Sequence, residues 1–266
     1  MARREPLYRT GMAIIRALFA VLRVQKTVVG VSNLPDTGGA VLAMTHFGYL
    51  EFALVAGVTW TTKRRPIRFL ATKSAFEKPF VGWALRATGQ IPVDLRGGAD
   101  AYSHAVVALR GGELIGIFPE AGVDASFTVR SLKTGAVRLA REAGVPLVPI
   151  AVWGGQRLLT KNRRVRFLER FGIPVTFAIG EPVEDGGETH EATLRLRDEL
   201  RRLLAAAQAG YPDDGEAAWW QPRHLGGTAP NPDEAAEIDR RIAAGRAAKR
   251  RRARRSQVRG GGGRGR

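Results

Sequence analysis

Short apolar and β-branched runs alternate with helical stretches from residue 27 to residue 208, and this alternation constrains the fold more than any other feature. Strands alternating with helices of about 10–15 residues are typical of an α/β layer fold. The predicted strands are 27–31, 39–46, 67–72, 90–94, 113–121, 145–154 and 173–183. The predicted helices are 50–61, a stretch within 78–88, 99–110, 132–144 and 191–208.

The basic charge of the chain is concentrated at its end. The formal net charge is +17, and the residues from Arg240 onward hold twelve Lys/Arg and no Asp/Glu. We therefore predict a disordered basic tail over 240–266, which would bind a dense negative surface such as anionic lipid headgroups or nucleic acid. A tail that only solubilises the protein is an equal alternative. Because the body shows no nucleic-acid-binding motif, nucleic acid is an unlikely partner.

The N-terminal stretch GMAIIRALFAVLRV is apolar apart from Arg16 and Arg23, which together with the preceding Arg9 recur every seven residues. This pattern predicts an amphipathic helix over 1–26 that lies in a membrane interface. The alternative is an ordinary helix packed on the core. We place the main domain at 27–210 and a Trp/Pro/Gly-rich extension at 211–239. In that extension Trp219 and Trp220 could pack on the domain or anchor at a bilayer.

Composition and missing motifs exclude several kinds of site. The chain has no cysteine, which excludes disulfides, cysteine ligands and a thiol nucleophile. Its four histidines are scattered, so we expect no metal site. Neither a G-x-S-x-G elbow nor a Walker A or G-x-G-x-x-G loop is present, which argues against that serine hydrolase design and against nucleotide cofactors.

The stretch THFGYLE contains the candidate catalytic pair, His46 and Glu51. On a continuous helix, five residues would turn the two side chains about 140° apart. Their pairing therefore requires that a strand ends near His46 and a helix begins near Glu51. A carboxylate on one imidazole nitrogen would fix the tautomer, and the other nitrogen could then take a proton from a substrate hydroxyl.

Four blocks in order resemble the lysophospholipid acyltransferase family, the 1-acylglycerol-3-phosphate acyltransferases and their relatives. The family's N-H-x4-D appears as Thr45, His46 and Glu51. Its F-P-E-G-T-R-S is represented by FPEAGVD at 118–124, and V-P-[IV]-[VL]-P-[VI] by VPLVPI at 145–150. The K-x-E-L block, which lies between the first and third motifs, and the later K-x-G-A are matched by Lys73, Pro79, Gly82, Gly89, Ile91, Val93, a displaced Arg96, Lys133, Gly135 and Ala136.

Departures from the family pattern shape the expected acceptor site. Glu51 replaces an aspartate, Gly48 stands where a serine is usual, and residues 121–123 replace Gly-Thr-Arg, which removes a cation expected near the acceptor phosphate. Phosphate binding is then expected from Arg96, Lys73, Lys133 or Arg130. Glu120 is predicted to be an acceptor-site residue, with capping of its strand-end loop as the alternative.

The resemblance implies an α/β fold with a mixed β-sheet flanked by helices. It also implies acyl transfer from acyl-CoA or acyl-ACP to a lysophosphatidic acid-type hydroxyl, which makes phosphatidic acid without a cofactor. The protein would associate peripherally with anionic lipids on the cytoplasmic face of the cell membrane, and the sequence indicates no oligomeric state. The alternatives are a glycolipid or other lysolipid acceptor, or a non-catalytic lipid- or nucleic-acid-binding protein on the same fold.

Overall fold

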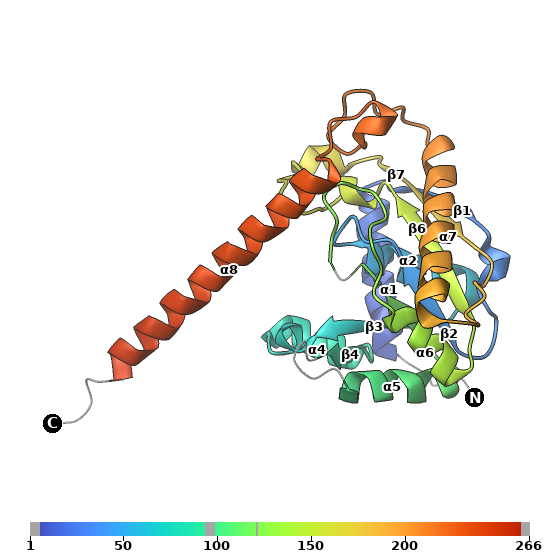
Figure 1. The fold of residues 1–266 in the computed structure, drawn as a ribbon, viewed down its shortest axis with the longest axis horizontal. Helices are drawn as coiled ribbons and strands as arrows, with labels where there is room; N and C mark the ends of the chain where they lie inside the picture. Colours follow the sequence, from blue (N-terminus) through green and yellow to red (C-terminus); the bar gives the residue numbers. More distant parts are fainter. Residues whose placement is uncertain (1–5, 94–98, 121, 262–266) are drawn as a thin grey trace. The chain divides into compact units, whose positions relative to one another are not determined.

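The computed structural model describes residues 6–93, 99–120 and 122–261, without the side chains of residues 80, 81, 99, 246 and 249–261 (Figure 1). The chain divides into two compact units. One comprises Met1–Asp124 and Thr128–Asp214, and the other comprises Ala125–Phe127 and Gly215–Arg266. The predicted main domain of 27–210 falls within the first unit, apart from residues 125–127. That unit also takes in the N-terminal helix.

A seven-stranded sheet forms the centre of the first unit. Its order is β1-β7-β6-β2-β5-β3-β4, and every neighbouring pair is parallel except β6 and β7, which are antiparallel. The predicted mixed sheet is thus confirmed. The strands are β1 (Gln25–Val29), β2 (Ala40–Met44), β3 (Ile67–Thr72), β4 (Ile91–Val93), β5 (Leu114–Ile117), β6 (Leu147–Trp153) and β7 (Pro174–Ile179).

The strand directions determine where functional loops gather. Strands β2, β3, β4, β5 and β6 run the same way, so their carboxyl ends meet at one edge of the sheet, which we call the carboxyl edge. Because β7 is antiparallel to β6, its carboxyl end lies at the opposite edge. Ligands of open α/β sheets bind outside the carboxyl ends of the strands.

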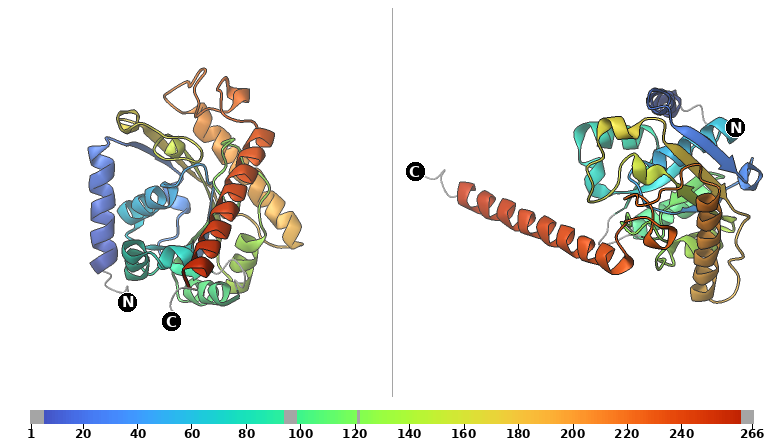
Figure 2. Two further views of the ribbon diagram at one scale, coloured as in Figure 1. Left: turned by 90° about the vertical axis from the view of Figure 1, so that its left-hand side faces the viewer. Right: turned by 90° about the horizontal axis from the view of Figure 1, so that it is seen from above.

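Helices cover both faces of this sheet. Figure 2 shows α1 and α2 on one side and α6 and α7 on the other. Leu42 and Met44 of the central strand β2 pack in one cluster with Leu54 of α2 and Met12 of α1. The helices of the first unit are α1 (Pro6–Val21), α2 (Glu51–Lys63), α3 (Lys73–Phe76), α4 (Pro79–Ala87), α5 (Ala99–Arg110), α6 (Gly135–Ala143) and α7 (Thr189–Ala209).

Helix α1 packs on the core through one face. Tyr8, Met12 and Phe19 are buried, and the Tyr8 hydroxyl accepts a hydrogen bond of 3.1 Å from the Ile67 N–H. This is the packed arrangement that the sequence left as an alternative, although the rest of the helix surface is exposed. Of the three arginines, Arg23 lies beyond the helix, with a φ of 51°. Within the described ranges, we find no helix with both the length and the apolar character needed to cross a bilayer.

The second unit contains the 30-residue helix α8 (Pro232–Gly261). Its start is well capped: Asn231 Oδ1 accepts from the Glu234 N–H at 2.9 Å, and the Asn231 N–H donates to the Glu234 carboxylate at 3.0 Å. Over residues 240–261 the structure therefore differs from the predicted disorder, because an Ala/Arg-rich sequence after a capping box and a first-turn proline favours helix. The rest of the predicted tail, 262–266, lies outside the described residues. Trp220 is buried, and the Trp219 ring meets the Phe127 ring edge-on at 6.4 Å.

Candidate active site

The strand-to-helix junction that the His46–Glu51 pair requires is present. Strand β2 ends at Met44 and helix α2 begins at Glu51, so the intervening loop folds the two side chains together at the carboxyl edge. His46 Nδ1 lies 3.1 Å from Glu51 Oε2, within hydrogen-bond distance. The His46–Glu51 contact that such a junction permits is therefore observed.

Backbone donors hold the Glu51 carboxylate in place. Glu51 is fully buried in the first turn of α2. The Phe47 N–H lies 3.0 and 2.9 Å from its two oxygens, and the Gly48 N–H donates to Oε1 at 2.9 Å. Burial raises the pKa of Glu51, and these backbone hydrogen bonds oppose the rise. Because both oxygens accept from N–H groups, the contacts fit the ionised carboxylate.

The environment keeps His46 neutral. Burial, followed by the charge of Lys161, lowers the pKa of His46 to about 4. With Nδ1 directed at the Glu51 carboxylate, Nδ1 carries the proton and Nε2 has its lone pair available. The ring stacks on Phe118 at 4.0 Å between centroids, and the side chain stays 18% exposed. His46 thus presents an oriented, neutral imidazole nitrogen at a partly exposed position.

Glu120 contacts the backbone on either side of the site. Its Oε1 accepts from the His46 N–H at 3.1 Å and its Oε2 from the Arg130 N–H at 3.4 Å. Burial, followed by the nearby Asp124 carboxylate, raises the pKa of Glu120 to about 8. These contacts match the alternative interpretation, in which Glu120 caps its strand-end loop. An acceptor role for this side chain remains a prediction.

The predicted phosphate ligands have different surroundings. Arg130 Nε pairs with Asp124 Oδ2 at 2.6 Å, and Asp124 is buried while its N–H donates to the His46 carbonyl at 2.8 Å. Lys133 is exposed, and its N–H bonds to the Pro119 carbonyl at 2.8 Å. Lys73 is exposed at the start of α3, on the carboxyl edge. Arg96 lies outside the described residues.

The sequence analysis missed Lys161. Its Nζ donates to the carbonyl of Val123 at 3.0 Å, and its charge acts on His46. Val123 occupies the position where the family motif has arginine, so a cation reaches that place from another loop. No motif covers Lys161, and only its location a few residues after strand β6, which ends at the carboxyl edge, could have pointed to it.

Two glycines bring the loops around Glu51 close together. A Cβ on Gly48 would lie 2.8 Å from the Gly155 carbonyl oxygen, too close for a serine without a shift of the loop. A Cβ on Gly155 would lie 3.2 Å from Glu51 Cγ. Gly48 and Gly155 therefore allow the loop before α2 and the loop after β6 to approach each other closely beside Glu51.

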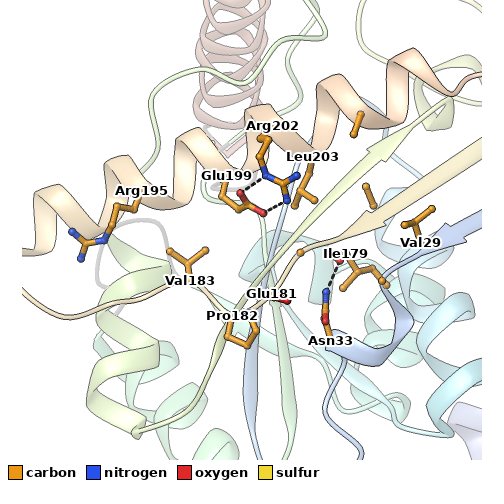
Figure 3. Close-up of a pocket in the computed structure, with 14 residues that line it drawn as sticks. Val29, Asn33, Ile179, Glu181, Pro182, Val183, Arg195, Glu199, Arg202 and Leu203 are labelled. Atoms are coloured by element: carbon orange, nitrogen blue, oxygen red, sulfur yellow. Dashed lines mark hydrogen bonds and ion pairs between the residues drawn. The ribbon is translucent and has the colours of Figure 1, made fainter.

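A hollow of about 640 Å³ lies elsewhere, by α7 and the carboxyl end of β7 (Figure 3). Its polar groups bond to neighbouring protein groups. The Glu199 carboxylate pairs with Arg202 at 2.7 Å, and Asn33 Nδ2 donates to the Ile179 carbonyl at 2.9 Å. Since β7 ends opposite the carboxyl edge, this hollow is separate from the His46 site.

Known proteins with similar sequences and folds bear on this site. The family model described as Acyltransferase matches residues 25–153, which include His46, Glu51 and Glu120. The chain is 31% identical over 192 residues to a 1-acyl-sn-glycerol-3-phosphate acyltransferase of Bacillus subtilis, an alignment that covers 71% of this chain and 85% of that protein. It is 30% identical over 227 residues to an uncharacterized protein of Mycobacterium leprae, covering 69% of this chain and 60% of that protein.

The fold is also similar to that of a solved structure. The crystal structure of the 1-acyl-sn-glycerophosphate (LPA) acyltransferase of Thermotoga maritima matches with a TM-score of 0.63 at 24% identity, and the match covers 80% of this chain and 86% of that one. The sequence match to the Bacillus protein extends over most of that relative, and the α/β architecture agrees with the solved structure. The chain belongs to the acyltransferase family that includes the 1-acyl-sn-glycerol-3-phosphate acyltransferases.

Proposed function

We propose that this acyltransferase moves a fatty acyl group from a thioester, acyl-CoA or acyl-ACP, to the free hydroxyl of a lysophosphatidate-type acceptor. The observation that carries the proposal is the His46–Glu51 contact, which leaves Nε2 of a neutral imidazole as a base. The printed names of the Bacillus and Thermotoga proteins support a 1-acylglycerol phosphate as the acceptor.

The reaction needs no nucleophile from the enzyme. His46 Nε2 would take the proton of the acceptor hydroxyl while its oxygen attacks the thioester carbonyl carbon. The new C–O bond forms, the C–S bond breaks, and the departing thiolate takes the proton back from His46. Glu51 would stabilise the transient imidazolium and hold its orientation, as a carboxylate does in hydrolase triads.

Lys161 is our candidate for the cation that the third motif has lost. Its ammonium binds the carbonyl of Val123, the position of the missing arginine, and it lies close enough to His46 to lower the pKa of the ring. A phosphate bound there would be held near the base. Arg96, Lys73, Lys133 and Arg130 remain candidates for further phosphate contacts, although Arg130 already pairs with Asp124.

Peripheral attachment to the anionic cytoplasmic leaflet is part of the proposal. It is supported by the twelve Lys/Arg side chains of the chain from Arg240 onward. Such side chains are attracted to anionic headgroups at short range.

The test is an acyl-transfer assay with a panel of acceptors: lysophosphatidate, the corresponding monoacylglycerol, other lysophospholipids and a glycolipid. Thiol release and product mass are measured with acyl-CoA and with acyl-ACP. We expect product from lysophosphatidate and far less from the monoacylglycerol, which lacks only the phosphate. Equal rates with both would refute a phosphate-binding acceptor site, and the absence of any transfer would refute the enzyme assignment.

A Lys161→Ala variant tests the phosphate ligand. It should raise the KM for lysophosphatidate about tenfold or more while the KM for the acyl donor changes little. Loss of this positive charge should also raise the pKa of His46, so the acid limb of the rate profile moves to higher pH. A variant with unchanged KM and an unchanged acid limb would remove Lys161 from the site.

A further inference from the structure

The loop after strand β6 exposes apolar side chains beside arginines. In the 163–171 segment, Phe167 is 63% exposed, Leu168 79% and Phe171 38%. The segment also holds four arginines and one glutamate, a net charge of +3. A cluster of exposed large apolar side chains in one short stretch is a mark of an interaction surface.

The segment has a defined shape. Phe167–Arg170 forms a 3-10 turn, and the rings of Phe167 and Phe171 meet edge-on with centroids 5.2 Å apart. Val165 is buried, and its carbonyl accepts from the Arg170 guanidinium at 3.1 Å. Val165 thus holds the turn on the core, while Leu168 stays exposed at its tip. The exposure of these apolar side chains is therefore a property of the fold.

Both ends of the segment are tied to functional parts of the first unit. On the N-terminal side, Thr160 Oγ1 donates to the Phe47 carbonyl at 2.6 Å, next to His46. On the C-terminal side, the Gly172 N–H donates to the Leu22 carbonyl at 2.9 Å, directly after α1. Figure 2 shows the segment beside that end of α1. The segment therefore connects the active-site loop with the N-terminal helix.

Helix α1 presents an apolar stripe of its own. Its most exposed apolar side chains are spaced i, i+7, i+11 and i+14, which places them on one face of a helix. They are Leu7, Ile14, Leu18 and Val21. The arginines at 9 and 16 lie on another face, about 180° away by the same geometry. The last two residues of the apolar stripe, Leu18 and Val21, lie at the end of α1 to which the 163–171 segment is bonded.

An anionic bilayer fits this chemistry better than a protein partner of the same kind. Phe and Leu can enter the headgroup region while Arg side chains reach the phosphates. A second copy of this chain would bring the same positive charge to the same place, which disfavours self-pairing. Nucleic acid would match the arginines but would leave an exposed Leu168 without a role.

We infer that the 163–171 segment, together with the exposed stripe of α1, docks the protein on an anionic phospholipid bilayer, with Phe167 and Leu168 inserted into the interface. The inference rests on the proposed lipid acyltransferase function, and it would bring the acceptor lipid to the His46 loop. It adds a contact that the predicted N-terminal helix and basic tail do not supply.

The first experiment measures insertion directly. Because the chain has no cysteine, Leu168→Cys offers a single site for an environment-sensitive fluorophore. Val107→Cys on α5, 69% exposed, is the matched control. We expect a blue shift at position 168 with phosphatidylcholine vesicles that contain phosphatidylglycerol, and no shift at position 107. Three outcomes would each overturn the inference. They are the absence of a shift at position 168, a shift that high protein concentration produces without vesicles, and a shift that RNA produces and vesicles do not.

The second experiment separates docking from catalysis. Phe167→Ser with Leu168→Ser should weaken binding to these vesicles at least about tenfold, whereas Val107→Ser should not. The loss should persist at about 0.5 M salt, where contributions from exposed charges are screened. Turnover of a monomeric short-chain acceptor should stay unchanged. Unchanged vesicle binding, or an equal loss of turnover on the monomeric acceptor, would overturn the inference. Inactive wild-type protein that still docks would refute only the proposed function.

Discussion

The two edges of the sheet differ in the burial and pairing of their ionisable side chains. At the carboxyl edge, His46, Glu51 and Glu120 are withdrawn from water, and burial shifts the pKa of each. At the opposite edge, the hollow in Figure 3 is lined by Glu199 and Arg202, which form a surface ion pair. An exposed pair of this kind contributes little to stability.

This contrast indicates that chemistry, more than the size of a hollow, distinguishes the candidate active site. The hollow by α7 has room and polar groups, but the charges are satisfied by each other. At the other edge, backbone N–H groups converge on one carboxylate and a neutral imidazole faces outward. Strongly shifted titration in a place that a substrate can reach is the usual property of catalytic groups.

The largest expected effect is that of His46→Ala. Without the base, the acceptor hydroxyl keeps its proton in the attack, and loss of a general base typically costs about 10²–10⁴-fold. The rate of thiol release should therefore fall by at least about a hundredfold, while circular dichroism and Tm stay close to wild type. A folded variant that retains more than about a tenth of the rate would contradict the assigned mechanism.

Glu51→Gln should come next in size. The amide has a single oxygen, so its NH₂ group would face at least one of the donors on Phe47, Gly48 or His46. Such a mismatch costs about 1–3 kcal/mol, and the imidazole also loses the carboxylate that orients it. We expect roughly a hundredfold loss in kcat and a lower Tm. Wild-type kcat together with a lower Tm would restrict Glu51 to a structural role.

Gly155→Ala tests the fit between Glu51 and the loop that faces it. The added Cβ would lie 3.2 Å from Glu51 Cγ and 3.5 Å from its Oε1, so the carboxylate would have to shift. We expect about a tenfold lower kcat, because small displacements at a reacting centre are costly. A kcat within about twofold of wild type, in a variant with normal Tm, would show that Glu51 tolerates the added methyl group.

Glu120→Gln should have a smaller effect. Its amide oxygen can still accept from the His46 N–H, and only the longer 3.4 Å contact from Arg130 is lost. We expect a loss of a few fold in rate, against a larger loss for Glu120→Ala. A loss for Glu120→Gln equal to that for Glu120→Ala would mean that catalysis needs the carboxyl group itself.

Stability against pH gives a second measurement. The folded pKa of Glu120, about 8, exceeds its ordinary value of 4.5. Its protonated form therefore favours the folded state, an advantage complete below pH 4.5 and lost as the pH rises towards 8. The Glu120→Gln variant should lack this decline in the free energy of unfolding. If the variant declines as wild type does, the decline belongs to another titratable group.

The sequence predicted the strands and the His46–Glu51 junction at the carboxyl edge, because the patterns that indicate them lie within short stretches of the chain. Short apolar and β-branched runs located the seven strands, and the spacing of His46 and Glu51 required the junction that is observed. Lys161 and Asp124 were missed because their roles depend on which loops meet in space. The helix over Pro232–Gly261 was missed because a run of like charges favours disorder, whereas the cap formed by Asn231 and Glu234 and the alanines after it favour helix.

The smallest expected effect is at the opposite edge, and it is the control for the whole comparison. Arg202→Ala removes a guanidinium that forms two 2.7 Å bonds to Glu199 while its side chain is 65% exposed. Exposed pairs of this kind contribute about 0.2–1 kcal/mol, so Tm should fall slightly and more at low salt than at high salt.

The kcat and both KM values should stay within about twofold of wild type, since Arg202 lies at the opposite edge of the sheet from His46. A tenfold change in any of them, in a variant with normal Tm, would show that the hollow by α7 communicates with the site or binds part of a substrate. The distinction between the two edges would then fail.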